Sequence, residues 1–161
     1  MPINFESQAN RFGVSVATSG NRIVVGADYD DAQGFDSNSG AAYVYRLSNG
    51  VWNLESKLID QFAEAAFGLP LDGYECGRSV DISDDGKTII VGCPGAPGGG
   101  KTNVYSFRDS DRRWVQSETF GGYPGNGLRI GESTALSGVD GTTVVGYGKS
   151  NGEVFSHGKD C

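Results

Sequence analysis

Phe12-Gly13-Val14-Ser15-Val16, followed by the apolar run Ile23-Val24-Val25-Gly26-Ala27, is a pair of segments that recurs twice further along the chain. A supersecondary unit that recurs in this way buries its apolar face against the neighbouring copies. The sequence therefore predicts one domain, residues 1–161, built as an array of repeats. The other two copies are Cys76-Gly77-Arg78-Ser79-Val80 with Ile89-Ile90-Val91-Gly92-Cys93, and Ile130-Gly131-Glu132-Ser133-Thr134 with Thr143-Val144-Val145-Gly146-Tyr147.

Four strands are predicted in each full repeat. Turn-forming residues with glycine separate the first two segments of each copy, and such turns join antiparallel strands. A third segment alternates aromatic residues with valine, which is typical of strands, and in two copies a fourth segment begins with tryptophan. We therefore expect an all-β array of three four-stranded antiparallel sheets. The repeats span about residues 10–59, 74–121 and 128–157, the third segments are 42–46, 103–107 and 153–156, and the fourth are 52–58 and 114–120.

The third repeat lacks a fourth segment of its own. The alternating residues at the start of the chain, with Ile3 and Phe5 on one face, have the length and pattern to supply that strand. We expect their backbone to pair with Glu153, Val154 and Phe155. Residues 1–8 then complete the last sheet of the same chain or of a neighbouring copy, and donation between copies builds a ring or a filament.

Composition argues against two classes of partner. The 161 residues include 13 lysines and arginines against 20 aspartates and glutamates, for a net charge of −7. Nucleic-acid binding relies on cationic side chains, so no nucleic-acid partner is expected. No apolar run approaches the roughly 20 residues of a membrane-spanning helix, so membrane insertion is not expected either. The first residues lack the pattern of a signal peptide, and composition alone leaves the compartment open.

The order of motifs over residues 12–58 resembles the FG-GAP repeat family. The second copy has Cys76 where the family has phenylalanine, and the third keeps only Gly131, Ser133 and the run 144–146. The motifs of the first copy are Phe-Gly-x-Ser-Val-Ala at 12–17, Val-Val-Gly-Ala at 24–27, Gly-Ala-Ala-Tyr-Val-Tyr-Arg at 40–46 and Trp-x-x-x-x-Lys-Leu at 52–58.

This resemblance implies blades of an integrin-type β-propeller. It also implies a noncatalytic structural or adhesive role at the cell surface or outside the cell, with copies of the chain, other surface proteins or glycans as partners. Propellers generally need four or more blades to close a ring, whereas this chain has three repeats. A ring of two copies, part of a longer propeller, a compact triangular domain and an open filament are the alternatives.

An acidic loop follows the first apolar run. Oxygen ligands at this density suit calcium, which accepts about six to eight of them in loose geometry, although their order is not that of an EF-hand. A calcium-dependent module that binds carbohydrate or protein is therefore the alternative function, and a solvated loop with Asx-turns is the other interpretation. The candidate ligands are Asp28, Asp30, Asp31, Asp36 and Asn38.

Three cysteines leave at least one without an intramolecular partner. Cys76 and Cys93 are predicted on neighbouring antiparallel strands, where they form a disulfide if the backbone bends them together and otherwise are two small buried apolar residues. Cys161 is the candidate for a free or intermolecular thiol.

The loop from Gly95 to Thr102 fits the phosphate-loop pattern Gly-x4-Gly-Lys-Thr. Phosphate binding by this motif needs a following helix, whereas residues 103–107 correspond to a strand of the first repeat. Nucleotide binding is therefore only a remote alternative, and a glycine-rich loop between strands is the favoured interpretation.

No set of residues indicates an enzyme, because His157 is the single histidine and no pair of carboxylates stands out. Aromatic residues in predicted loops are candidates for stacking on a sugar or a protein, or for covering sheet edges. These are Tyr29, Phe35, Tyr74 and Tyr123.

Overall fold

The computed structural model describes residues 10–31, 38–61, 73–121 and 128–137, and the backbone of 143–147 and 154–157. These residues form eleven β-strands, so the predicted all-β class is confirmed. The strands are β1 (Val16–Ser19), β2 (Arg22–Ala27), β3 (Ala41–Ser48), β4 (Val51–Leu58), β5 (Ser79–Ile82), β6 (Thr88–Cys93), β7 (Lys101–Arg108), β8 (Arg113–Gly121), β9 (Ile130–Leu136), β10 (Thr143–Tyr147) and β11 (Val154–His157).

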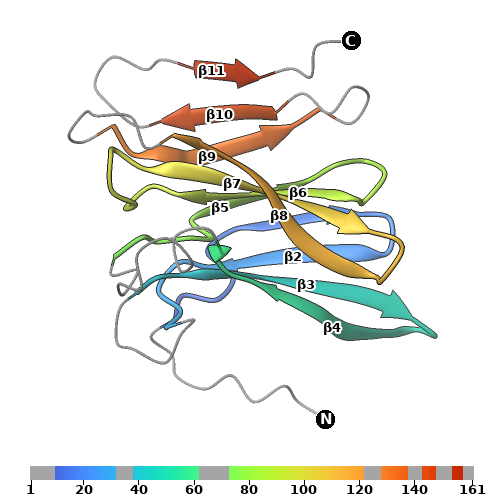
Figure 1. The fold of residues 1–161 in the computed structure, drawn as a ribbon. Coiled ribbons are helices and arrows are strands. Elements are labelled where there is room, and N and C mark those ends of the chain that lie inside the picture. Colours follow the sequence, from blue (N-terminus) through green and yellow to red (C-terminus); the bar gives the residue numbers. More distant parts are fainter. Residues whose placement is uncertain are drawn as a thin grey trace.

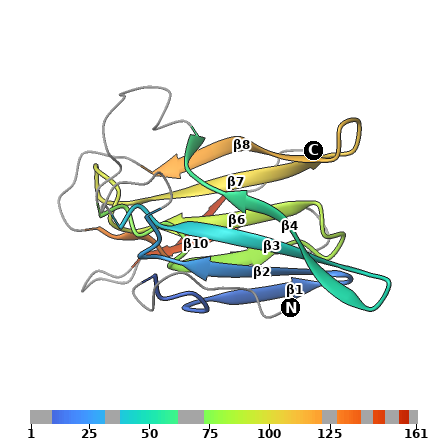
Figure 2. The ribbon, with the colours of Figure 1, turned by 90° about the horizontal axis from the view of Figure 1, so that it is seen from below.

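The strands form three antiparallel sheets that follow chain order. Sheet 1 contains β1 to β4, sheet 2 contains β5 to β8, and sheet 3 contains β9 to β11 as far as the described residues extend. Figure 1 shows sheet 2 lying between sheets 1 and 3, and Figure 2 shows the same stack from below. Sheets 1 and 3 therefore form the two ends of the stack.

Sheets 1 and 2 have matching hydrogen-bond registers. Ile23 pairs with Tyr45 as Ile89 pairs with Tyr105, and both sheets have a bulge after the third-strand valine, at Val44 and at Val104. Position by position, each residue of sheet 1 thus has a counterpart in sheet 2. This correspondence allows the environments of equivalent residues to be compared directly.

The hydrophobic core lies mainly between sheets 1 and 2. Val24 and Val44 project from sheet 1 toward Ile89, Val91 and other fully buried side chains of sheet 2. Residues on the inward face of a strand alternate with those on its outward face, and the two inward faces bury each other. The apolar runs thus become the middle strands of stacked sheets, as the repeat predicts.

Candidate functional site

The same tight turn lies at the start of each sheet, before β1 and β5 and overlapping the first residues of β9. In each turn the first residue has a positive φ near 50°, and the third is a glycine with φ near 90°. The amide of the fourth residue donates a hydrogen bond to the carbonyl of the first, over 3.0 to 3.2 Å. We call these turn 1 (residues 11–14), turn 2 (residues 75–78) and turn 3 (residues 129–132).

Turns 2 and 3 dock on the preceding sheet through equivalent contacts to their main chain. Ser15 Oγ donates to the carbonyl of Gly77, and Ser79 Oγ donates to the carbonyl of Gly131, both over 2.8 Å. A parallel bridge pairs Gly40 with Cys76, and an equivalent bridge pairs Gly100 with Ile130. We call the two contact regions junction 1/2 and junction 2/3.

Glycine in the second strand makes this docking possible. A Cβ on Gly26 would overlap the carbonyl of Gly77, and a Cβ on Gly92 would overlap the carbonyl of Gly131. In both junctions the main chains of adjacent sheets therefore touch at this glycine, in addition to the parallel bridge. The repeated glycine of the apolar run is explained by this contact, because any side chain there would separate the sheets.

Junction 1/2 also contains a buried arginine. Arg22 is 7% exposed, forms two hydrogen bonds with Glu55 at 2.8 and 3.0 Å, and lies over the rings of Phe107 and Trp114. Burial alone would raise the pKa of Glu55, but hydrogen bonds from Arg22 and Trp114 outweigh it and lower that pKa. Both members of this charged pair belong to sheet 1, Arg22 to β2 and Glu55 to β4, and the guanidinium lies against the Phe107 and Trp114 rings of sheet 2.

Junction 2/3 uses ion pairs that are more accessible to solvent. Arg129 contacts Glu75 at 2.7 Å and Glu132 at 2.8 Å, and Arg78 contacts Glu132 at 3.2 Å. Burial would raise the pKa of Glu132, but the arginines outweigh it and lower that pKa. Asp81 adds one partly buried hydrogen bond between sheets 2 and 3, since its carboxylate accepts from the Leu136 backbone amide over 2.7 Å.

Two of the predicted calcium ligands are buried in ion pairs. Asp28 is fully buried, and its Oδ2 lies 3.2 Å from both Arg11 and Arg78. Asp30 is 3% exposed, and its Oδ1 accepts a hydrogen bond from Lys57 over 2.7 Å. These side chains therefore do not belong to a solvated loop, which the sequence had offered as the other interpretation.

The rest of the acidic loop is described only in part. Asp31 Oδ1 accepts a hydrogen bond from the Asn38 amide over 3.1 Å, whereas Asp36 lies outside the described residues. Tyr43 donates a short hydrogen bond to Asp30 Oδ2; burial first, and then this bond, raise its pKa. Within the part of the chain that the structure describes, no three acidic, histidine or cysteine residues are grouped as a metal site.

Cys76 and Cys93 form a disulfide within the second repeat. Cys76 lies in turn 2, Cys93 ends β6, and both are almost fully buried. In the third repeat the equivalent positions are the paired Ile130 and Tyr147. Cys161 lies outside the described residues.

The loop from Gly95 to Thr102 leads into a strand. Lys101 begins β7 and forms an ion pair with the buried Asp60. A phosphate loop would need a helix at this point, so the structure has the glycine-rich loop between strands that the sequence favours.

The predicted stacking aromatics have different environments. Tyr29 is 36% exposed, with the Arg11 guanidinium 4.6 Å from the centre of its ring. Tyr74 packs partly against the core beneath Lys101, and burial raises its pKa, so this ring is not the exposed platform suggested by the sequence. Phe35 and Tyr123 lie outside the described residues.

The predicted assembly strand is only partly within the described chain. Val154 and Phe155 belong to β11, which pairs with β10 at the edge of sheet 3. Ile3, Phe5 and Glu153 lie outside the described residues. Their predicted pairing therefore stays a prediction.

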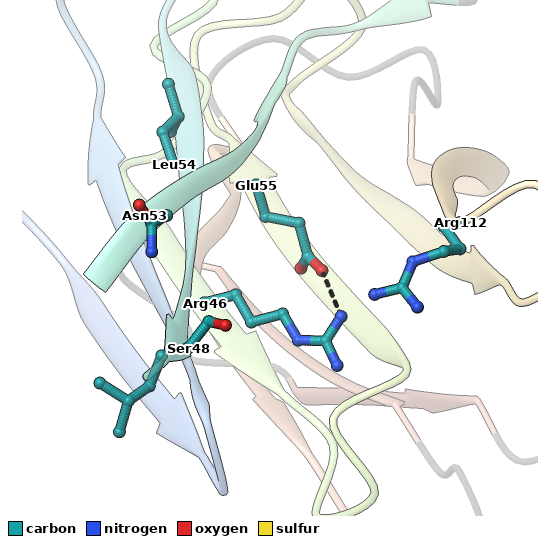
Figure 3. A pocket seen from close by; sticks show the side chains of 7 residues that line it. Arg46, Ser48, Asn53, Leu54, Glu55 and Arg112 are labelled. Atoms are coloured by element: carbon teal, nitrogen blue, oxygen red, sulfur yellow. Dashed lines mark ion pairs between the residues drawn. The ribbon is translucent and has the colours of Figure 1, made fainter. Parts of the chain in front are cut away.

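A surface pocket lies at the rim of junction 1/2, beside the turn between β3 and β4. Figure 3 shows the guanidinium groups of Arg46 and Arg112 pointing toward each other near Glu55, and Arg46 forms an ion pair with Glu55 at 3.7 Å. Sequence reasoning missed this site and the buried Arg22, since no motif links residues so distant along the chain. The other lining residues are Leu47, Ser48, Asn53 and Leu54.

Comparison with known families identifies part of the chain. Residues 6–45 match the family model of the FG-GAP repeat. The matched segment includes turn 1, β1, β2, the acidic loop and the beginning of β3. No curated protein matches the chain in sequence.

Two solved structures are similar over much of this chain. Saccharomyces cerevisiae Sqt1 has 11% identity over 97% of the chain, with a TM-score of 0.47. TolB from Acinetobacter baumannii has 16% identity over 89% of the chain, with a TM-score of 0.44. The chain spans only 38% and 29% of those two proteins, respectively. Among the described residues, no helix has the length and apolarity to cross a membrane.

Proposed function

We propose that this chain is a noncatalytic structural or adhesive module that assembles with itself by donating an N-terminal strand. The observation that supports this most directly is the inequality of the sheets: sheets 1 and 2 have four strands, whereas the described part of sheet 3 has three and ends at β11. An edge strand offers unpaired backbone groups to another chain. Residues 3–7, with Ile3 and Phe5 on one face, are the proposed fourth strand.

Chain order supports the same assignment. The fourth strand of sheet 1, β4, precedes turn 2, and the fourth strand of sheet 2, β8, precedes turn 3. Residues 3–7 precede turn 1 in the same way. By this pattern they belong to a sheet located before sheet 1, and sheet 3 of a neighbouring copy is the proposed sheet. Donation in this direction is head-to-tail, so it gives a ring or a filament.

The FG-GAP repeat supports the wider context of this proposal. We propose a location at the cell surface or outside the cell, with surface proteins or glycans as partners, because the resemblance to FG-GAP repeats implies that context. Tyr29, exposed on the first repeat beside Arg11, is the proposed contact for such a partner.

Deletion of residues 1–8 tests strand donation. The full chain is expected to sediment as an assembly of several 16.9 kDa copies, and the deletion variant as a single copy. Adding a peptide of residues 1–8 to the deletion variant should produce a saturable complex through β11. A deletion variant that assembles as well as the full chain would overturn the proposal.

Calcium binding at the acidic loop is the second candidate. One observation favours it: Asp28 Oδ1 is buried and has no hydrogen-bond partner among the described residues. A cation that bound this oxygen and Asp36 would raise the melting temperature by linkage. Titration with calcium and then a chelator tests this, with Asp36→Asn as the variant expected to lose the shift, and no shift in the full chain would rule calcium out.

A further inference from the structure

The face of sheet 1 that points away from sheet 2 carries exposed apolar side chains. The equivalent positions of sheet 2 are buried against sheet 1 in junction 1/2. Val16 corresponds to Val80, because each faces the valine of its second strand in the register. Val16 is 66% exposed, whereas Val80 is 8% exposed. The same side of the repeat is thus covered in sheet 2 and uncovered in sheet 1.

The fourth strands, β4 and β8, show the same difference in side-chain exposure. Trp52 is 40% exposed and Leu54 is 56% exposed. Their counterparts by register are Trp114, at 7%, and Gln116, at 3%. Leu47, the partner of Trp52 across the strand pair, is also exposed, at 37%.

Turn 1 has the same backbone as turns 2 and 3, but its glycine is not packed against another sheet among the described residues. Gly13 has a φ of 92°, and Gly77 and Gly131 have 90°. A Cβ on Gly77 or Gly131 would strike the main chain of the preceding sheet, whereas one on Gly13 would have nothing within 4 Å among the described residues. We call Gly13, Val16, Leu47, Trp52 and Leu54 the head face.

The opposite end of the stack has the complementary hydrogen-bond donor, a serine hydroxyl. Ser133 of β9 corresponds to Ser15 and Ser79, which donate to the glycine carbonyls of turns 2 and 3. Ser133 and the neighbouring Ala135 are exposed on β9, whereas Ser79 is buried in junction 2/3. We call Ser133 and Ala135 the tail face.

We propose that the head face of one copy docks on the tail face of a second copy as a further junction of the same stack. In that junction Ser133 Oγ donates to the Gly13 carbonyl, and Val16, Trp52 and Leu54 are covered by the second copy's sheet 3. The proposed partner is a second copy because the head face continues the interface that already joins sheet 1 to sheet 2 and sheet 2 to sheet 3 within the chain.

This inference rests on the proposed self-assembly but concerns a different surface. Strand donation uses residues 3–7 and the edge of β11, whereas face docking uses the head and tail faces. Exposed apolar surface of this kind is typical of protein interfaces. Head-to-tail docking between unlike faces does not limit itself to two copies unless the ring closes.

Charged substitutions on the head face and on the tail face test the proposed docking. Val16→Glu, Leu54→Glu and Ala135→Glu each place a carboxylate at an exposed position, so each variant should retain the wild-type melting temperature. We expect sedimentation to give single 16.9 kDa copies for all three. Val51→Glu is the matched control, because Val51 is 58% exposed and its counterpart Arg113 is also exposed. This control should assemble as the wild type does.

Mixing the variants tests the direction of docking. Val16→Glu retains a normal tail face and Ala135→Glu a normal head face, so an equimolar mixture should form dimers and nothing larger. Mixtures that remain single copies would overturn the inference, as would loss of assembly in Val51→Glu, which would attribute the effect to added charge alone.

The outcomes also separate this inference from strand donation. If all face variants assemble normally and deletion of residues 1–8 abolishes assembly, face docking is overturned and strand donation stands. If the face variants become single copies and the deletion variant still assembles, the reverse holds. A wild-type chain that stays a single copy at every concentration overturns both.

Discussion

Junctions 1/2 and 2/3 share a main-chain design and differ in the side chains around it. In both, a serine hydroxyl donates to the glycine carbonyl of the following turn over 2.8 Å. Elsewhere in the interface, junction 1/2 has a buried Arg22 between aromatic rings, whereas junction 2/3 has ion pairs of Arg129 that are partly exposed. Main-chain docking thus defines how the repeats stack, and side chains determine how strongly each pair is held.

The glycine contacts should give the largest effects, and they should be equal in the two junctions. Gly26→Ala and Gly92→Ala each place a methyl group against a carbonyl of the next turn. We expect each to cost about 4 kcal/mol or to prevent folding. Gly50→Ala is the control for backbone strain alone, because at its φ of 75° an added side chain is strained, whereas no atom lies near its Cβ among the described residues. Urea unfolding measures all three, and a Gly92→Ala protein as stable as the control would contradict the shared design.

Arg22 should distinguish the junctions. In the wild-type chain Arg22 donates to the Glu55 carboxylate and, over 2.8 Å, to the Gly86 carbonyl. Arg22→Ala removes this partner from both groups in a buried site. Removing one member of a buried pair typically costs about 3 kcal/mol. Thr88 is the equivalent residue of sheet 2, and Thr88→Ala should cost less than about 1 kcal/mol. Equal losses in denaturant unfolding would mean that the junctions do not differ in this way.

Reduction of the Cys76–Cys93 disulfide should have the next largest effect. The bond closes a loop with a sequence separation of 17 residues, and a loop of this size contributes roughly 2 to 3 kcal/mol. Cys161→Ser protein, unfolded in urea with and without reductant, isolates this bond. Identical midpoints would show that turn 2 is held by junction 1/2 without help from the disulfide.

Acid should weaken junction 2/3 by a smaller amount. The pKa of Glu132 is lowered in the folded chain, so its contribution to stability is present above the pKa of an unfolded glutamate and is lost as the pH falls through the lower folded value. We therefore expect Glu132→Gln to reduce the slope of melting temperature against pH below about pH 4.3, the ordinary pKa of glutamate. Salt should reduce the same contribution, because these charges are partly exposed. An unchanged slope in Glu132→Gln would contradict the assignment.

Local pattern predicted the sheets well. The apolar runs of residues 23–27 and 89–93 became β2 and β6, and the tryptophan segments became β4 and β8. Alternation and turn residues act between neighbours in the chain, so the sequence alone contains that information. The glycine of each run was recognised as part of the repeat, but its contact with the next turn became evident only from the stacked sheets.

Charged residues were harder to interpret from sequence. Asp28 and Asp30 are predicted as calcium ligands because they are close in the chain, and that prediction does not anticipate the ion pairs with Arg78 and Lys57 that the structure shows. These cations are separated from them by 50 and 27 residues. Ion pairs between residues far apart in the chain have no local signature, and the same holds for the contact of Arg22 with Trp114.

The contact of Gly26 with turn 2 and of Gly92 with turn 3 sets the distance between adjacent sheets. Because it is made by main chain against main chain, the spacing of the sheets depends on covalent geometry and not on the size of any side chain. Residues elsewhere in a junction are then free to change from a disulfide to an isoleucine, or from a buried arginine to a threonine, without altering the spacing. An array with such main-chain contacts can gain, lose or exchange repeats while the spacing of the remaining sheets stays the same.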